Sequence, residues 1–168
     1  VAQASKTDAL AHTAGVGAGA YLIGKQHRRA SLLATRSVCS DTPDFWRKPS
    51  HHNPQHAGRF TGEPAYFRHI LHATRLVLQE TRLSPQDFRY AVFHTPNGIF
   101  PVQVAKKLGF TEQQLLPGMQ VVEIGNAYAG AAPVALANTL SSARSGDRIL
   151  VSSYGSGAGS DCMIWEVS

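Results

Sequence analysis

Tyr90-Ala-Val-Phe-His-Thr-Pro-Asn-Gly98 marks the centre of the predicted sheet. Residues 90–93 are apolar, β-branched or aromatic, which predicts a buried strand that runs directly into His94. Pro96 cannot continue a strand ladder, Asn97-Gly98 turns the chain, and residues 99–108 have helical spacing. His94 therefore stands at the carboxyl end of a core strand, the edge at which open α/β sheets bind ligands. Its imidazole exchanges protons near neutral pH, which favours a functional role, but a packed histidine fits the same pattern.

The composition is that of a globular protein with a core of its own. Of the 168 residues, 43% are hydrophobic and 16% are charged, which argues against a disordered chain. The net charge of +5 favours anionic partners, such as small molecules that carry phosphate. Lysine and arginine form no stripe interleaved with aromatic residues, so nucleic acid is not an expected partner. We also expect no membrane span and no signal peptide, and hence a cytoplasmic protein.

The cysteines, histidines and glycines bear on metal, redox and nucleotide chemistry. Cys39 and Cys162 form no Cys-x-x-Cys pair and exclude a framework of disulfides, which favours a reducing compartment. His51-His-Asn-Pro-Gln-His56 lacks cysteine and carboxylate at ligand spacing, so we expect a solvated loop and no metal. The glycines of residues 15–19 precede an apolar run instead of following a strand, so we expect close backbone packing rather than a dinucleotide loop.

Further strands and helices surround His94. Asn126 follows an apolar run and precedes a helix, which repeats the arrangement at His94; helix N-termini attract negative charge, but asparagine is also a common turn former. Gly155-Ser-Gly-Ala-Gly159 predicts a tight bend and not a Walker loop, because no Lys-Ser or Lys-Thr pair follows. The order predicts a layered α/β or α+β domain with a mixed sheet. The expected strands are residues 21–24, 30–39, 90–93, 121–124, 149–154 and 162–167, and the expected helices are residues 61–82, 99–108 and 133–143.

Several segments together resemble one known family. They are Asp41-Thr-Pro-Asp-Phe-Trp-Arg47, Gly58-Arg-Phe-Thr-Gly-Glu-Pro-Ala-Tyr-Phe67, Ala91-Val-Phe-His-Thr-Pro-Asn-Gly98, Ile124-Gly-Asn-Ala-Tyr-Ala-Gly130 and Ser153-Tyr-Gly-Ser-Gly157. In these segments the chain resembles the thiolase superfamily, and within it the hydroxymethylglutaryl-CoA synthases of archaeal and related bacterial type. The first two segments resemble the synthases in particular rather than the superfamily at large.

The resemblance implies a thiolase-like layered fold of which this chain is one part. Family members have two similar halves, so residues 1–24 would be the tail of the N-terminal half with its last strand. Residues 25–168 would be the C-terminal half, with a mixed five-stranded sheet and flanking helices. The catalytic cysteine and glutamate belong to the first half. Cys39 and Cys162 do not match the family's nucleophile motif, and we expect both to be ordinary buried or half-buried thiols.

The resemblance also implies an activity. Similar enzymes are acyltransferases of the mevalonate pathway, which condense acetyl-CoA with acetoacetyl-CoA and need no cofactor beyond these coenzyme A thioesters. His94 matches the histidine that donates to acetoacetyl-CoA, Asn126 matches an asparagine that lines the same site, and Ser156 matches a serine near the same oxygen atoms. Lys106 and Lys107 are candidates for binding the coenzyme A phosphates, or else form a solvated helix face. Archaeal relatives commonly have lysine where this chain has Ile99, which weakens a phosphate contact there.

Other accounts remain open at this point. A type-III ketoacyl synthase resembles the chain at His94 and Asn126 but lacks the Asp-Phe-Trp-Arg segment. A catalytically silent half, serving as a scaffold, fits the missing nucleophile. The superfamily suggests a homodimer, and a thiolase that channels substrate is a further partner to test.

Overall fold

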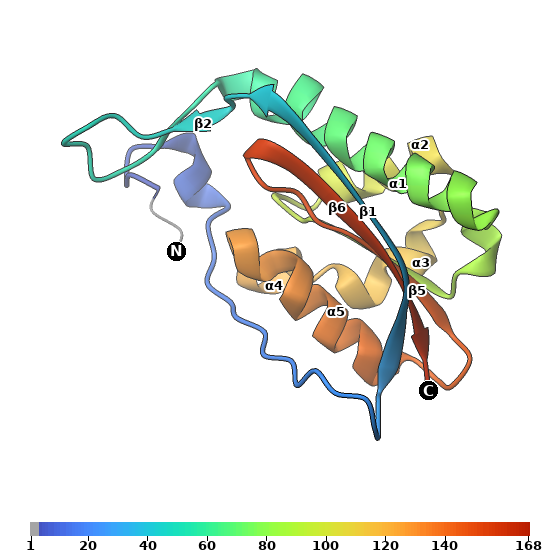
Figure 1. Cartoon of the computed structure of the whole chain (residues 1–168). Helices are drawn as coiled ribbons and strands as arrows, with labels where there is room; N and C mark the ends of the chain where they lie inside the picture. Colours follow the sequence, from blue (N-terminus) through green and yellow to red (C-terminus); the bar gives the residue numbers. More distant parts are fainter. Residues whose placement is uncertain (1–3) are drawn as a thin grey trace.

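The computed structural model describes residues 4–168, apart from the side chain of residue 158. β4 runs parallel to β5, whereas β6 is antiparallel to both β5 and β1. The predicted layered fold with a mixed sheet is thereby confirmed (Figure 1). The larger sheet has four strands in the order β1 (Ala30–Thr42), β6 (Gly157–Val167), β5 (Arg148–Ser152) and β4 (Tyr90–Phe93).

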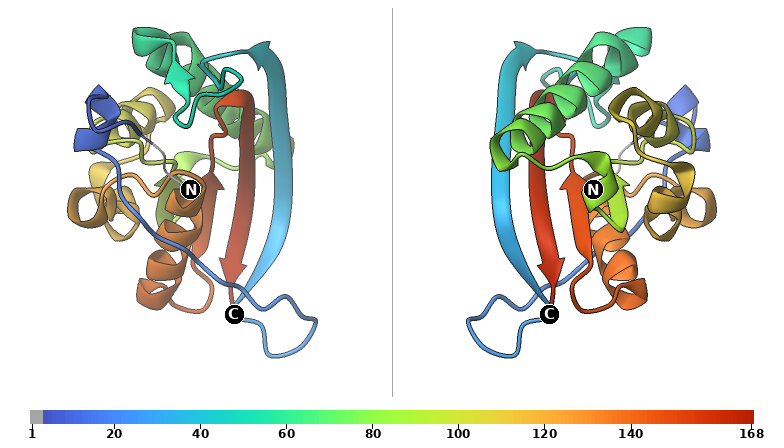
Figure 2. Two further views of the ribbon diagram at one scale, coloured as in Figure 1. Left: turned by 90° about the vertical axis from the view of Figure 1, so that its left-hand side faces the viewer. Right: turned by 90° about the vertical axis from the view of Figure 1, so that its right-hand side faces the viewer.

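The two faces of the sheet bury different side chains, because successive strand residues point to opposite faces. On β4, Ala91 and Phe93 point into the larger core, and Val92 points into the smaller one. Helix α5 (Ala131–Ser142) packs on the side of the smaller core, and Figure 2 shows the sheet between the helical layers. The larger core receives side chains from α1 (Phe67–Thr81), α2 (Phe100–Leu108) and α3 (Glu112–Leu115).

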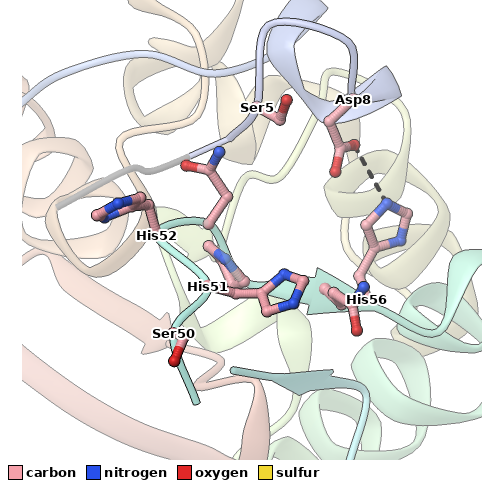
Figure 3. A pocket seen from close by; sticks show the side chains of 9 residues that line it. Ser5, Asp8, Ser50, His51, His52 and His56 are labelled. Atoms are coloured by element: carbon pink, nitrogen blue, oxygen red, sulfur yellow. Dashed lines mark hydrogen bonds and ion pairs between the residues drawn. The ribbon is translucent and has the colours of Figure 1, made fainter. Parts of the chain in front are cut away.

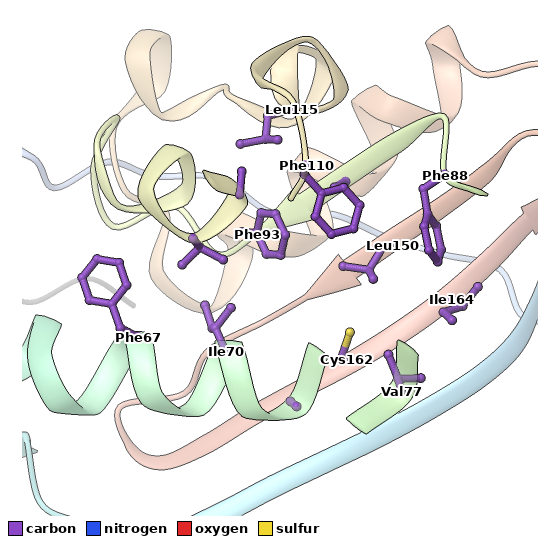
Figure 4. Close-up of a cluster of buried hydrophobic side chains, with 14 of the residues drawn as sticks. Phe67, Ile70, Val77, Phe88, Phe93, Phe110, Leu115, Leu150, Cys162 and Ile164 are labelled. Carbon is purple, nitrogen blue, oxygen red and sulfur yellow. The ribbon is translucent and has the colours of Figure 1, made fainter. Parts of the chain in front are cut away.

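The larger core fixes the strand that carries His94. Phe67, Ile70 and Val77 of α1 have the spacing of one helix face and point toward the sheet (Figure 4). There they meet Phe93 at the end of β4 and Leu150 in the middle of β5. Each fully buried side chain of this kind stabilises the fold by about 1.5–3 kcal/mol. This packing holds the carboxyl end of β4 in a fixed position.

The helix predicted at residues 61–82 begins later than expected. Glu63 is extended (φ −120°, ψ 120°), because a residue before proline avoids helical backbone angles. A 3-10 turn (Gly58–Thr61) and a π turn (Gly62–Tyr66) precede α1. The backbone of Arg82 is left-handed (φ 57°) and ends the helix close to the predicted position.

The apolar run at residues 121–124 forms a helical turn, α4 (Val121–Ile124), and not the predicted strand. The backbone N–H groups of Ile124 and Gly125 donate to the carbonyls of Gln120 and Val121 at 2.9 and 3.0 Å. Periodicity cannot separate a strand from a helix in an apolar run this short. The prediction of a five-stranded sheet is therefore wrong, because the sheet has four strands and lacks this one.

Residues 21–24 do not form the predicted strand either. They are exposed, and within residues 4–168 they belong to no strand ladder; the nearest pairing is a parallel bridge between Ala14 and Asn126. The close packing predicted for the preceding glycines is confirmed, since a Cβ on Gly15 would lie 1.9 Å from the Ile124 carbonyl oxygen. This segment runs beside α4 and α5 (Figure 1). Residues 1–3 of the proposed N-terminal tail lie outside the described residues.

The predicted loop between β1 and α1 contains a small hairpin of β2 (Phe45–Trp46) and β3 (Gln55–His56). Capping boxes at Ser84 and Thr111 begin the short helical turns that follow them. Among residues 4–168, no helix has the length and apolarity needed to cross a bilayer. The remaining short turns are η1 (Ala9–His12), η4 (Pro85–Asp87), η5 (Leu116–Gly118) and η6 (Tyr128–Gly130).

Candidate active site

His94 lies at the carboxyl end of β4, as predicted, and is only 8% exposed. Its backbone N–H donates to the Ser152 carbonyl at 2.8 Å, and its own carbonyl accepts from the Tyr66 hydroxyl at 2.6 Å. The imidazole packs against two aromatic rings, with centroids 6.3 Å from Tyr66 and 6.2 Å from Tyr154. Burial lowers the pKa of His94 to about 4. The ring is therefore neutral at pH 7, with one N–H donor and one acceptor nitrogen.

The turn after His94 is set by its own sequence. The Asn97 side-chain oxygen accepts from the backbone N–H groups of Ile99 and Phe100, each at 2.9 Å. This satisfies two of the N–H groups that a helix start leaves unpaired. Pro101 sits in the first turn of α2, where its missing N–H has no consequence. The strand, turn and helix predicted around His94 are all confirmed.

Asn126 is buried, as its candidate role requires, and it is also a turn former. Its side-chain oxygen accepts from the Tyr128 N–H at 2.8 Å. Its backbone N–H donates to the Thr13 carbonyl at 2.6 Å, and its carbonyl accepts from Gly15 at 2.8 Å. The amide oxygen is thus committed to local structure, which leaves the Nδ2 group as the part that could meet a ligand.

Ser156 lies in the predicted glycine bend, and its side chain is exposed. Gly155 and Gly159 close the bend by exchanging backbone hydrogen bonds of 2.8 and 3.0 Å. Gly157 has a positive φ of 77° and donates its N–H to the carboxylate of Asp44. Asp44 also accepts from the Tyr154 hydroxyl at 2.8 Å. The bend is therefore attached to the Asp-Phe-Trp-Arg segment of the β1–β2 connection.

Three further residues lie near His94 and were not singled out from the sequence: Asp44, Tyr66 and Tyr154. All three lie inside the motif segments, but only the fold shows that their side chains converge on His94 and Ser156. Burial raises the pKa of Tyr154, with its Asp44 hydrogen bond as a further cause, and the nearby Ser156 acts in the opposite direction. Tyr154 thus packs against the His94 ring and lies two residues before Ser156 in the chain.

The other predicted site residues stand apart from this cluster. Within residues 4–168, no hydrogen bond or ring contact joins the Asn126 side chain directly to His94 or Ser156. A pocket of about 400 Å³ lies between Asn97-Gly98, which follow His94, and Val121–Gly125, which precede Asn126. Lys106 and Lys107 are exposed on α2, and the Lys107 ammonium lies 4.9 Å from the centroid of the Phe67 ring. Their contact with phosphate stays a prediction.

The histidine tract lines a separate pocket of about 580 Å³ beside the N-terminal segment (Figure 3). His56 accepts from the Gly58 N–H through Nδ1 at 3.1 Å, so its Nε2 proton points to Asp8, 3.2 Å away. His51 and His52 come from the turn between β2 and β3. Among the described residues, no group of three or more His, Cys, Asp and Glu side chains is arranged to hold a metal ion.

The two thiols differ in their surroundings. Cys162 is buried, as expected, and burial raises its pKa to about 12. Cys39 is exposed, so the prediction of a buried or half-buried thiol is wrong there. The reason is that β1 is an edge strand, and Cys39 is on the face that α1 does not cover.

Solved structures with related folds define the class. A 3-oxoacyl-[acyl-carrier-protein] synthase III from Aquifex aeolicus superposes with a TM-score of 0.74 at 20% identity, covering 84% of this chain and 46% of that chain. A structure described as HMG-CoA synthase complexed with CoA gives a TM-score of 0.72 at 21% identity over 90% of this chain and 47% of that chain. The fold is therefore thiolase-like.

Sequence comparison then gives the family. Residues 78–167 match the family described as 3-oxoacyl-[acyl-carrier-protein (ACP)] synthase III C terminal, and the chain belongs to it. A hydroxymethylglutaryl-CoA synthase of Methanothermobacter thermautotrophicus is 53% identical over 99% of this chain and 48% of the relative. One of Methanopyrus kandleri is 48% identical over the same shares. The chain spans about half the length of these curated relatives, which confirms the predicted resemblance to one half of such a synthase.

Proposed function

We propose that this chain is the C-terminal half of an enzyme that condenses acetyl-CoA with acetoacetyl-CoA to form hydroxymethylglutaryl-CoA. One observation carries the proposal: a buried, neutral histidine ends β4 in a chain that is 53% identical to such a synthase. The proposed substrates are the two coenzyme A thioesters, and the proposed pathway is the mevalonate route. The enzyme is proposed to be cytoplasmic and dimeric.

The chemistry explains why a neutral imidazole suits the site. In the proposed reaction an acetyl group is held as a thioester on a cysteine of the other half, and its methyl carbon loses a proton. The resulting enolate carbon attacks the ketone carbon of acetoacetyl-CoA, whose oxygen becomes an alkoxide and then takes a proton. Water finally hydrolyses the thioester and frees the product. An N–H donor aimed at the ketone oxygen stabilises the charge that develops there. His94 can supply this donor without carrying a charge of its own.

The other predicted residues take supporting roles in the proposal. The Nδ2 group of Asn126 is proposed to place the thioester carbonyl or a water molecule, because its amide oxygen is already bonded to the Tyr128 N–H. Ser156 is proposed to line the same site from the glycine bend. Lys106 is proposed to meet the coenzyme A phosphates, and Lys107 is a weaker candidate because it lies over Phe67.

The missing half is proposed to cover the N-terminal segment and the edge near His94. Val16 is 90% exposed and Ile23 is 84% exposed, while Leu22 between them is fully exposed. Such a run of large apolar side chains favours an interface over a solvent face. A related peroxisomal thiolase of Saccharomyces cerevisiae (TM-score 0.54, 17% identity, 61% of this chain and 30% of that chain) is described as built from two core domains of identical topology. We therefore keep residues 1–24 as the tail of a first half and residues 25–168 as the second.

Two experiments test the proposal. In the complete enzyme, His94→Ala should reduce condensation with acetoacetyl-CoA about 100- to 1,000-fold, the usual loss for one oxyanion donor, and acetylation by acetyl-CoA much less. His72→Ala, which removes an exposed histidine of α1, is the matched control. Equal loss in both steps would contradict the donor role. The chain alone should form no acyl-enzyme with radiolabelled acetyl-CoA, and stable label on Cys39 or Cys162 would overturn the assignment.

A second candidate is favoured by the family match itself. The match is to a 3-oxoacyl-[acyl-carrier-protein] synthase III domain, so an acyl-carrier-protein thioester is the competing substrate. Comparing the complete enzyme's kcat/KM for acetoacetyl-CoA with that for an acyl-carrier-protein thioester separates the two. Mass spectrometry of the purified sample would show whether a companion polypeptide carries the nucleophile, or whether the chain is a silent scaffold. Size-exclusion chromatography tests the proposed dimer.

A further inference from the structure

We infer that Tyr154 is the positioning residue of this site: its phenol, anchored on the buried carboxylate of Asp44, fixes the His94 imidazole and the Ser156 bend relative to each other. The inference rests on the proposed function for its kinetic readout, but not for its structural one.

The anchor is a single buried carboxylate. Asp44 is 2% exposed, and its backbone carbonyl accepts from the Ala57 N–H at 2.8 Å, which ties it to the end of the β2–β3 hairpin. One side-chain oxygen accepts from the Tyr154 hydroxyl at 2.8 Å, and the other accepts from the Gly157 N–H. Tyr154 and Gly157 flank Ser156 in the chain, so one carboxylate holds the residues on both sides of it. Hydrogen bonds to a carboxylate are roughly twice as strong as neutral ones, which makes this an effective anchor.

The direction of these hydrogen bonds follows from chemistry. A carboxylate has no proton to donate, so the Tyr154 hydroxyl must donate to Asp44. The phenol oxygen can then only accept from any further partner. The Tyr154 hydroxyl is thus committed to Asp44 as a donor.

The ring of the same tyrosine packs against His94 and against two other buried rings. These are Tyr66, at 5.6 Å and edge-on, and His69, at 6.0 Å between centroids. His69 is itself held at both nitrogens, 2.6 Å from the Ala65 carbonyl and 2.7 Å from the Ser40 hydroxyl. The His94 ring lies 6.2 Å from the Tyr154 ring and 6.3 Å from the Tyr66 ring, so the three rings pack against one another. Because these neighbours hold the Tyr154 ring in place, its contact with His94 restricts the position of the imidazole at the end of β4.

The test uses the complete enzyme and two variants, one of which removes the Tyr154–Asp44 hydrogen bond while the other weakens it. Tyr154→Phe keeps the ring and removes its donor; Asp44→Asn keeps the shape of the acceptor and removes its charge. Both should lower kcat for condensation about 10- to 100-fold, the change that matches loss of one hydrogen bond to a charged group. Both should also shift the ring ¹H and ¹⁵N resonances of His94 at pH 7 in protein labelled with ¹⁵N-histidine. Tyr90→Phe, which removes the hydroxyl of an exposed 3.4 Å hydrogen bond at the far end of β4, is the control and should change neither.

The outcomes distinguish the positioning role of Tyr154 from the proposed acyl-condensing function. Folded variants with wild-type His94 resonances and wild-type kcat would overturn the positioning role. The positioning role would also be overturned if kcat fell only in proportion to the fraction of folded protein while the folded molecules kept wild-type His94 resonances. If one variant does not fold, the other decides. Shifted His94 resonances in an enzyme that performs no acyl condensation would support the positioning role and reject the proposed function instead.

Discussion

The Tyr66 hydroxyl donates a 2.6 Å hydrogen bond to the backbone carbonyl of His94, and this bond joins the start of α1 to the end of β4. Tyr66 is fully buried, and burial raises its pKa well above the ordinary value of 10.0, so the phenol stays a donor across the physiological range. The carbonyl it meets lies beyond the last pair of the β4–β5 ladder. The bond therefore holds the site histidine where regular strand pairing has ended.

Tyr66→Phe should destabilise the fold by about 1–3 kcal/mol, because it leaves the buried His94 carbonyl without its donor. Urea unfolding followed by circular dichroism measures the change. Tyr90→Phe removes a longer, exposed hydrogen bond and should change the free energy of unfolding by less than about 0.5 kcal/mol. Equal effects of the two variants would show that the buried bond has no special weight.

The pH dependence of stability should carry the signature of His94. Its pKa is about 4 when folded and near 6.5 when unfolded, so protonation favours the unfolded chain. The contribution of the neutral His94 imidazole to the free energy of unfolding is fully present above pH 6.5. It is lost as the pH falls toward 4, by about 3 kcal/mol in total. His94→Gln, which stays neutral, should remove that slope. Denaturation curves of both proteins at several pH values measure the difference, and identical slopes would contradict a buried neutral imidazole.

The two thiols should react differently in the folded protein. Cys39 is exposed on the edge strand, whereas Cys162 is buried and burial raises its pKa to about 12, so its reactive thiolate is suppressed. A thiol reagent such as Ellman's reagent should therefore label Cys39 promptly and Cys162 more than about a hundredfold more slowly, as local opening allows. Cys39→Ser and Cys162→Ser variants assign each phase. Rapid labelling of Cys162 at neutral pH would mean that the larger core is open there.

The sequence was sufficient for the elements with clear local signals. The strand before His94, its turn and its helix were predictable because an apolar run, Pro96 and the Asn97-Gly98 pair each specify one conformation. The capping boxes at Ser84 and Thr111 were equally local, since both partners lie within one turn of the chain. In these places side-chain chemistry and final fold agree.

What could not be predicted depends on distant contacts. Residues 121–124 have the composition of a strand, but the fold makes them a helical turn whose neighbour, Gly15, admits no side chain. Cys39 alternates like a buried strand residue, yet it faces outward because β1 ends the sheet. The link from Asp44 to Tyr154 spans more than half of the chain, and no spacing rule reaches that far. The sequence thus proposed His94 and Ser156 as candidate site residues, and only the tertiary structure revealed the residues around them.

Gly159 should tolerate no side chain, because it lies against β1 at the base of the bend that carries Ser156. A Cβ there would be 1.8 Å from the Val38 carbonyl oxygen, which is a backbone atom of the paired strand and cannot move aside alone. Gly159→Ala must therefore open the β1–β6 ladder, and we expect a loss of about 3 kcal/mol or more in unfolding free energy. Gly24→Ala is the matched control: its Cβ would meet nothing within 4 Å, and its effect should lie between zero and a gain of about 1 kcal/mol. Chemical denaturation gives both values, and backbone hydrogen exchange shows whether the loss is centred on residues 38 and 159. A stable Gly159→Ala variant with normal exchange there would mean that the two strands lie further apart than the structure places them.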